Sequence, residues 1–364
     1  MMRRLVGCAL SLLLGAGIGA AEAQAQVDMS AFVDAYYGYN FNKSDPMLLR
    51  TFDVAHNAFT LAVAEVDIVR EPTASSRIGG RVDLAFGPNA DIVSSFEPGA
   101  GDEIFRNLQQ GYISLMANEQ LTLDFGKFVT PLGAEVIESQ DNWNYSRSVL
   151  FGFAIPFYHA GLRATYAASD QFSLSGYVVN GWNNVIENNS DKTFIGSVAL
   201  TPNEQLTWYG NLIAGKERDF DGDGEQDLRW VFDTTLSFAA TEMLTLMANF
   251  DYGSEADADP VTAGDPGTFW GIAAYARFQA QEDWAFAGRF EFIDDSSDGW
   301  MGIGQKVQTF TATSDHTVYE DLIARFEFRF DTSENDFFID EGDTPPALSQ
   351  NQFSLTAGFV YELQ

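Results

Sequence analysis

The sequence is poor in cysteine and in basic residues. Its 364 residues include one cysteine, Cys8, which excludes a disulfide framework and a cysteine-based metal site. The 20 lysine and arginine residues are outnumbered by 52 aspartate and glutamate residues, and the formal net charge is −32. Binding to nucleic acid through neutralised phosphates is therefore excluded. After residue 25, no apolar run approaches the roughly 18 residues that a membrane helix needs.

The first 25 residues have the features of a secretory signal peptide. Arg3 and Arg4 precede an apolar run over residues 5–21, and small residues at 21, 23 and 25 form two overlapping cleavage sites. We therefore expect residues 1–25 to be removed and residues 26–364 to form the mature chain. A secreted chain without a membrane helix is either soluble or a membrane β-barrel.

Apolar and polar residues alternate along most of the mature chain. A period of two places each set on one face of a β-strand. The apolar sets are Phe353, Leu355, Ala357, Phe359, Tyr361 and Leu363; Leu322, Ala324, Phe326, Phe328 and Phe330; Trp284, Phe286, Phe290 and Phe292; and Ile78, Val82, Leu84 and Phe86. About 16 strands can be placed in this way.

The connections between these strands alternate in length. Short ones fall at residues 71–75, 118–119, 169–170, 202–204, 241–242, 281–282 and 314–316, and long ones lie between them. A soluble sandwich mixes its connection lengths, whereas an outer-membrane barrel has short periplasmic turns and long extracellular loops. With the aromatic outer faces, this predicts an all-β fold: a transmembrane antiparallel β-barrel of about 16 strands.

Charged residues occupy the faces opposite the apolar sets. A barrel of 16 strands leaves a water-filled lumen, in which charges cost little, whereas a dry core would penalise each unpaired charge by several kcal/mol. The side chains that we expect to face the lumen are Arg77, Arg81, Asp83, Asp124, Arg163, Arg277, Arg289, Glu291, Arg325, Glu327 and Arg329.

The connection at residues 129–157 is long and unusually apolar for a loop. A connection longer than about 15 residues is usually functional, and its apolar residues need a surface to pack against. We expect it to fold inward against the barrel wall and narrow the pore, with Glu135, Glu138, Asp141 and Arg147 in the lumen, where charge sets ion preference. The alternative is an extracellular cap over the barrel mouth.

Several segments resemble one protein family. Residues 126–139 (GKFVTPLGAEVIES), 141–148 (DNWNYSRS), 154–166 (AIPFYHAGLRATY) and 176–184 (GYVVNGWNN) are similar to the OmpL-like putative beta-barrel porin family. The resemblance implies an outer-membrane, porin-like protein without established catalytic residues. Its partners would be membrane lipid and small hydrophilic solutes, and a homotrimer is an assembly common among 16-stranded porins.

An acidic loop carries the sharpest metal-ligand pattern. Asp219, Asp221 and Asp223, followed by Gly224, match the start of an EF-hand calcium loop. Position twelve is Trp230 instead of glutamate, so the full motif fails, although Asp227 at position nine offers another carboxylate. The sequence is compatible with two interpretations, a calcium site and one more solvated acidic loop. No other cofactor is indicated.

Three functions are compatible with this sequence. The first is passive diffusion of small hydrophilic solutes, with the net charge favouring cations and the inward arginines opposing that preference. The second is a structural or surface-interaction barrel that the 129–157 loop seals. The third is a hydrolase at the extracellular rim, where His159 is a candidate base, but no spaced Ser/His/Asp signature accompanies it. We expect a channel and not an enzyme.

Overall fold

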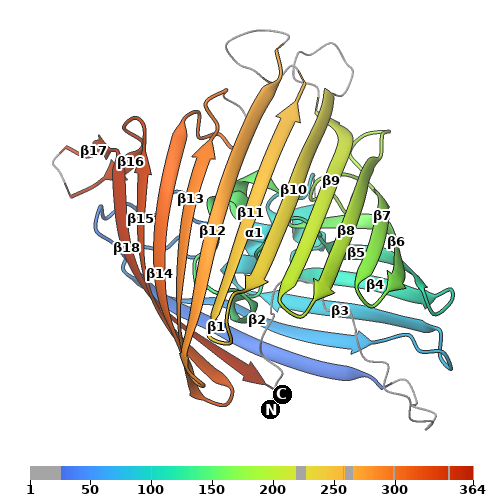
Figure 1. The fold of residues 1–364 in the computed structure, drawn as a ribbon. Coiled ribbons are helices and arrows are strands. Elements are labelled where there is room, and N and C mark those ends of the chain that lie inside the picture. Colours follow the sequence, from blue (N-terminus) through green and yellow to red (C-terminus); the bar gives the residue numbers. More distant parts are fainter. Residues whose placement is uncertain are drawn as a thin grey trace.

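The computed structural model describes residues 26–363 except 100, 219–226, 257, 259–264, 298–299 and 343–344. The expected signal peptide at 1–25 lies outside the described residues, as do the first three carboxylates of the calcium pattern. Sixteen antiparallel strands close into one barrel (Figure 1). The predicted all-β transmembrane barrel is confirmed.

Each barrel strand pairs with its neighbour in sequence, and β1 pairs with the last strand, β18, to close the ring. The strands are β1 (Asp28–Asn40), β2 (Ala58–Arg70), β3 (Ile78–Phe86), β4 (Leu108–Met116), β5 (Leu121–Val129), β6 (Tyr158–Ser169), β7 (Phe172–Val179), β8 (Thr193–Asn203), β9 (Leu206–Arg218), β10 (Asp227–Ala239), β11 (Leu244–Glu255), β12 (Gly267–Gln281), β13 (Trp284–Asp294), β14 (Lys306–Tyr319), β15 (Leu322–Ser333) and β18 (Asn351–Leu363).

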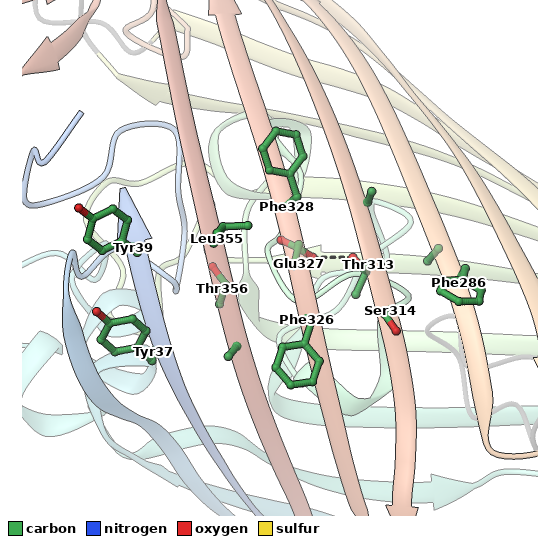
Figure 2. Close-up of a pocket in the computed structure, with 13 residues that line it drawn as sticks. Tyr37, Tyr39, Phe286, Thr313, Ser314, Phe326, Glu327, Phe328, Leu355 and Thr356 are labelled. Atoms are coloured by element: carbon green, nitrogen blue, oxygen red, sulfur yellow. Dashed lines mark hydrogen bonds between the residues drawn. The ribbon is translucent and has the colours of Figure 1, made fainter. Parts of the chain in front are cut away.

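Alternation explains why these segments form a barrel wall. On β15, Phe326 and Phe328 are exposed on the outside, whereas Glu327 between them is buried and accepts a hydrogen bond from Thr313 of β14 at 2.8 Å (Figure 2). Neighbouring outer aromatic rings also contact one another, as Phe330 and Phe353 do with centroids 4.5 Å apart. Such cross-strand pairs stabilise the sheet in its register.

Six of the seven predicted short connections overlap turns between strands, some of them shifted by one or two residues, and the seventh is wrong. Residues 314–316 were expected to be a turn, but β14 continues to Tyr319 and the chain turns at Glu320 and Asp321. Ser-Asp-His resembles a turn sequence. In the barrel, however, Asp315 is directed inward, where it forms ion pairs with Arg277 at 3.2 Å and Arg325 at 3.3 Å.

The long connections contain short elements that alternation does not predict. They are the helices α1 (Pro88–Ser94) and α2 (Gly101–Ile104), a 3-10 turn η1 (Ser139–Asp141), a π-helical turn η2 (Leu150–Ala154), and a separate hairpin of β16 (Phe338–Asp340) and β17 (Ala347–Ser349). Within the described residues, no helix is long and apolar enough to cross a membrane.

The interior is less polar than expected. Apolar side chains from the inner faces of β7 to β13, including Val179, Ile213 and Ile293, are completely buried. They belong to one cluster with Leu150 and Phe151 of the β5–β6 connection. These apolar side chains are covered by the loop. The same strands also carry buried charges, such as Asp233 of β10 and Glu291 of β13, so the loop packs against an inner wall that is both apolar and charged.

Candidate pore constriction

The connection between β5 and β6 crosses the inside of the barrel. The backbone N–H of Val149 donates to Glu291 Oε2 of β13 at 2.7 Å, and that of Tyr145 donates to Glu327 Oε2 of β15 at 2.7 Å. Strand β13 is eight strands from β5 in either direction around the ring of sixteen, so it lies diametrically opposite. The loop lies within the ring of strands (Figure 1) and not over its mouth.

Three arginines of the wall opposite β5 hold the loop, and we call Arg289 of β13 with Arg325 and Arg329 of β15 the arginine wall. Arg289 binds Glu135 Oε1 at 2.7 Å, Glu291 Oε1 at 2.9 Å and the carbonyl of Ser146 at 2.6 Å. Arg329 donates to the carbonyl of Arg147 at 2.8 Å and pairs with Asp331 at 2.7 Å. Arg325 donates to the carbonyl of Ser139.

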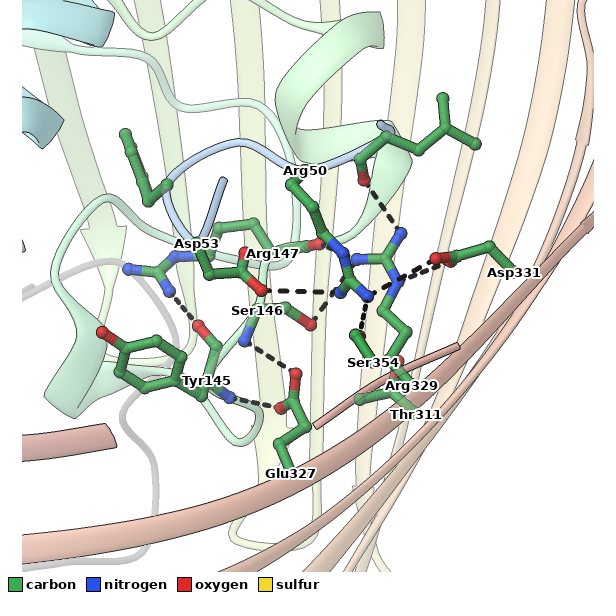
Figure 3. Close-up of polar contacts among 12 residues, drawn as sticks. Arg50, Asp53, Tyr145, Ser146, Arg147, Thr311, Glu327, Arg329, Asp331 and Ser354 are labelled. Atoms are coloured by element: carbon green, nitrogen blue, oxygen red, sulfur yellow. Dashed lines mark hydrogen bonds and ion pairs between the residues drawn. The ribbon is translucent and has the colours of Figure 1, made fainter. Parts of the chain in front are cut away.

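A second loop joins this network from the β1–β2 connection. Figure 3 shows Arg50 between Asp53, at 3.5 Å, and Asp331, at 3.4 Å, with a further hydrogen bond to Ser354. Arg329 also donates to the carbonyl of Leu49 at 3.0 Å. Burial raises the pKa of Asp53 and lowers that of Arg50, and each charge partly offsets the shift of the other.

Arg50 and Asp53 were not found from the sequence, although a signal was present. Met47, Leu49 and Phe52 are apolar loop residues, and all three are buried. This is the same pattern that predicts inward folding for residues 129–157. Applied to residues 41–57, it would have placed a second loop in the lumen.

The four residues expected at the constriction have different environments. Glu135 is buried and paired with Arg289. Arg147 is buried and donates to the carbonyls of Val136 at 2.8 Å and Tyr145 at 2.5 Å, so its guanidinium binds the loop to itself. Glu138 is half-buried and contacts Gln109, and burial raises the pKa of its carboxyl to about 7. Asp141 is exposed.

Most of the predicted lumen residues form ion pairs on the inner face. The pairs are Arg81 with Asp83 at 2.8 Å, Arg163 with Asp124 at 2.7 Å, Arg277 with Asp315 at 3.2 Å, Arg289 with Glu291 at 2.9 Å and Arg329 with Asp331 at 2.7 Å. Arg77 instead lies just before β3, is exposed and donates to the carbonyl of Ala117 at 3.4 Å. The inner face is thus charged but largely paired.

One group of carboxylates on the wall beside β1 departs from this pairing. We call Glu65 and Asp67 of β2 with Asp83 of β3 the carboxylate cluster. One oxygen from each of the three lies within 4.8 Å of the others. Sequence reasoning named Asp83 alone, because β2 alternates poorly (AFTLAVAEVDIVR). The i, i+2 spacing of Glu65 and Asp67 was the signal that would have placed both on the inner face.

The structure describes one of the two other predicted sites in part and the other in full. Of the calcium pattern, Asp227 alone is described, and it begins β10 opposite Arg218 in register. His159 is completely buried, with Nδ1 at 2.9 Å from the carbonyl oxygen of Gly181 and Nε2 at 3.1 Å from Thr130 Oγ1. Both ring nitrogens therefore contact a backbone carbonyl or a threonine. The serine and carboxylate partners that the hydrolase hypothesis requires are not among these contacts.

Solved structures of outer-membrane channels share this architecture. The structure of the outer membrane channel DcaP of Acinetobacter baumannii is 13% identical over 94% of this chain and 99% of its own, with a TM-score of 0.61. An anion-selective porin from Comamonas acidovorans is 11% identical over 93% and 99%, with a TM-score of 0.62. OmpF of Salmonella typhi, in complex with daunomycin, is 13% identical over 93% and 97%, with a TM-score of 0.63. At these identities the likeness concerns the fold.

The sequence comparisons differ in outcome. No curated protein matches the sequence. A family described as putative beta-barrel porin-2, OmpL-like, matches residues 26–363, almost the whole of the expected mature chain. The match agrees with the closed 16-stranded barrel, its apolar outer face and its channel-like structural neighbours. The chain therefore belongs to the OmpL-like putative beta-barrel porin-2 family and is an integral porin-type barrel of the outer membrane.

Proposed function

We propose that this porin is a passive diffusion channel for small hydrophilic solutes, narrowed by residues 129–157. The observation that carries the proposal is the path of the β5–β6 loop, which spans the lumen from β5 to β13 and is fixed there by charge-assisted hydrogen bonds. A loop held in this way defines the width of the pore. Charged side chains beside such a constriction control which ions pass.

We further propose a preference for cations. The arginine wall is engaged by carboxylates and loop carbonyls, so its positive charge is mostly neutralised locally. In the part of the chain that the structure describes, the three acids of the carboxylate cluster have one guanidinium partner, that of Arg81. The net charge of −32 adds to the attraction of cations.

Planar-bilayer recording of the refolded protein tests both parts of this proposal. We expect discrete conductance steps. In a potassium chloride gradient, the reversal potential should have the sign expected when potassium is more permeant than chloride. Folded protein that gives no steps would contradict the channel. A reversal potential of the opposite sign, which indicates that chloride is more permeant, would contradict the proposed cation preference but not the proposed channel.

A sealed structural or surface-interaction barrel is the second candidate, favoured by one observation. Several connections contribute to the apolar cluster inside the barrel: Leu49 from β1–β2, Val93 from α1, Leu150 from β5–β6 and Met301 from β13–β14. Deleting residues 134–152 distinguishes the two candidates. A constricted channel gains conductance from a measurable starting value, whereas a sealed barrel conducts only after the deletion.

Two finer features belong to the same proposal. A solved structure of OmpT from Vibrio cholerae is described as a trimer form, and we propose a homotrimer for this chain, to be tested by its mass in detergent. We also propose calcium binding by the acidic loop of Asp219, Asp221, Asp223 and Asp227. Calcium titration of the Asp221→Asn/Asp223→Asn variant tests that site.

A further inference from the structure

The carboxylate cluster on β2 and β3 brings three acids together on the inner face. Asp67 and Asp83 are directly opposite each other in the antiparallel register, and Glu65 lies two residues before Asp67 on the same face. Like charges directly opposite each other across two strands destabilise a sheet. A barrel that keeps this arrangement needs a positive charge at the cluster.

The protein itself supplies less positive charge than the cluster requires. Arg81 forms the ion pairs of the cluster within the described residues, with Nε 2.8 Å from Asp83 and Nη2 3.9 Å from Asp67. Three carboxylates and one guanidinium leave two negative charges when all are ionised. Glu138 of the constriction loop is close by, since Gln109 donates to both Glu138 and Glu65.

Glu65 provides a separate indication that the carboxylate cluster binds a ligand. Its side chain is nearly inaccessible, with 1% of the residue exposed. Oε1 accepts a hydrogen bond from Gln109 at 3.0 Å, but Oε2 is buried and has no hydrogen-bond partner in the described part of the chain. A buried carboxylate oxygen without a donor or cation is costly, because burial removes its hydration.

The ligand chemistry indicates a hard divalent cation. All three donors are carboxylate oxygens, which suit Ca²⁺ or Mg²⁺, and neither histidine nor cysteine belongs to the group. These oxygens all lie within 4.8 Å of one another, so one ion can contact all three. Ca²⁺ accepts flexible coordination geometry, whereas Mg²⁺ demands a nearly ideal octahedron. Three carboxylates fixed on two strands of the barrel wall therefore favour calcium.

We propose that Glu65, Asp67 and Asp83 bind one Ca²⁺ inside the barrel, at a site separate from the acidic loop at 219–227. The ion cancels the two excess negative charges of the cluster with Arg81. It also gives the buried Glu65 oxygen a partner. The site joins β2 to β3, and Gln109 links it to the constriction loop by donating to both Glu65 and Glu138, so the ion stabilises the wall that this loop contacts.

Calcium titration of the mature barrel in detergent, after removal of metals with a chelator, tests this proposal. All proteins carry Asp221→Asn/Asp223→Asn, which removes the loop pattern. We expect one Ca²⁺ per chain by calorimetry at pH 8, and an affinity at least tenfold lower after adding Glu65→Gln/Asp67→Asn. The matched control is Asp124→Asn, an inner-face carboxylate paired with Arg163, which should leave calcium affinity unchanged.

Thermal unfolding provides a readout independent of conductance. Calcium should raise the Tm of the Asp221→Asn/Asp223→Asn protein and leave the Tm of the Glu65→Gln/Asp67→Asn protein unchanged, with folding checked by circular dichroism. Absence of binding at millimolar calcium overturns the proposal and indicates that Glu65 and Asp67 share a proton instead. Binding that survives Glu65→Gln/Asp67→Asn, or that Mg²⁺ reproduces with equal affinity, also overturns it.

Discussion

The arginine wall and the carboxylate cluster arise from the same alternation of residues but have opposite charge balance. On β13 and β15, buried acids have guanidinium partners, as Glu291 has Arg289 and Asp331 has Arg329. On β2 and β3, three acids share Arg81. The first region uses its charge to hold a loop. The second region has more acids than cationic partners, so its excess negative charge can attract a cation.

The difference indicates which side chains are free to act on a solute. A charge already paired and buried contributes mainly to the position of its neighbours, because its field is cancelled within a few ångströms. The inward arginines, counted from the sequence, oppose cation preference. Their contacts in the barrel reduce that opposition and give the remaining carboxylates more influence.

The largest expected effect follows from removing an arginine of the arginine wall. Arg289→Ala leaves Glu135 and Glu291 buried without their shared cation. We expect the free energy of unfolding to fall by about 3–5 kcal/mol, the range for breaking a buried ion pair from one side. Urea unfolding of the barrel in micelles, followed by tryptophan fluorescence, measures it.

Arg277→Ala is the matched control for that variant. Arg277 is also an inward arginine, but its side chain is 27% exposed and its partner Asp315 retains Arg325. A loss of about 1 kcal/mol or less is expected there. Equal losses from the two variants would show that the arginine wall is not held together by its ion pairs.

Neutralising one carboxylate should have opposite effects in the two regions. In chelator at pH 8, Glu65→Gln removes a buried acid that lies beside two other acids, and we expect a gain of about 1 kcal/mol in the free energy of unfolding, the upper end of the range for cross-strand pairs. Asp331→Asn removes a charge that serves both Arg50 and Arg329, and a loss of about 3 kcal/mol is expected. Changes of the same sign would contradict the comparison.

The outer face and the strand number were predictable, because lipid and alternation impose a simple rule on each strand. Phe353, Leu355 and Phe359 of β18 are exposed on the outside as their spacing predicts. The inner face follows no such rule. On β9, Asn211 and Ile213 both face inward, since one meets polar neighbours and the other meets the apolar cluster.

Pairing between strands was the second limit of sequence reasoning. Asp67 and Asp83 meet because of the register of β2 against β3, which the pattern within either strand does not contain. Register also explains the incorrect turn at residues 314–316, where Asp315 pairs with arginines on β12 and β15. The apolar residues of the 129–157 loop, in contrast, identified a lumen-crossing segment without knowledge of register.

A smaller effect is expected from pH. With its pKa raised to about 7 by burial, the Glu138 carboxyl gains charge as pH rises through neutrality. Its ionised fraction goes from about 10% at pH 6 to about 90% at pH 8. The cation-to-anion permeability ratio from reversal potentials should therefore increase over this interval. Glu138→Gln should abolish the increase. Asp141→Asn should preserve it but move it to lower pH, because the Asp141 charge helps to raise the pKa of Glu138.

The smallest effect concerns salt and separates the outer acidic loops from the carboxylate cluster. The Debye length shortens from about 10 Å at 0.1 M salt to about 3 Å at 1 M, and buried charges are screened less than exposed ones. Cation preference should therefore fall modestly between these concentrations as the loops lose their influence. With calcium removed by a chelator, the cation preference that remains at 1 M salt should be reduced further by Glu65→Gln/Asp67→Asn. If 1 M salt removes the preference entirely, the exposed loops alone produce it and the inner carboxylates play no part in selection.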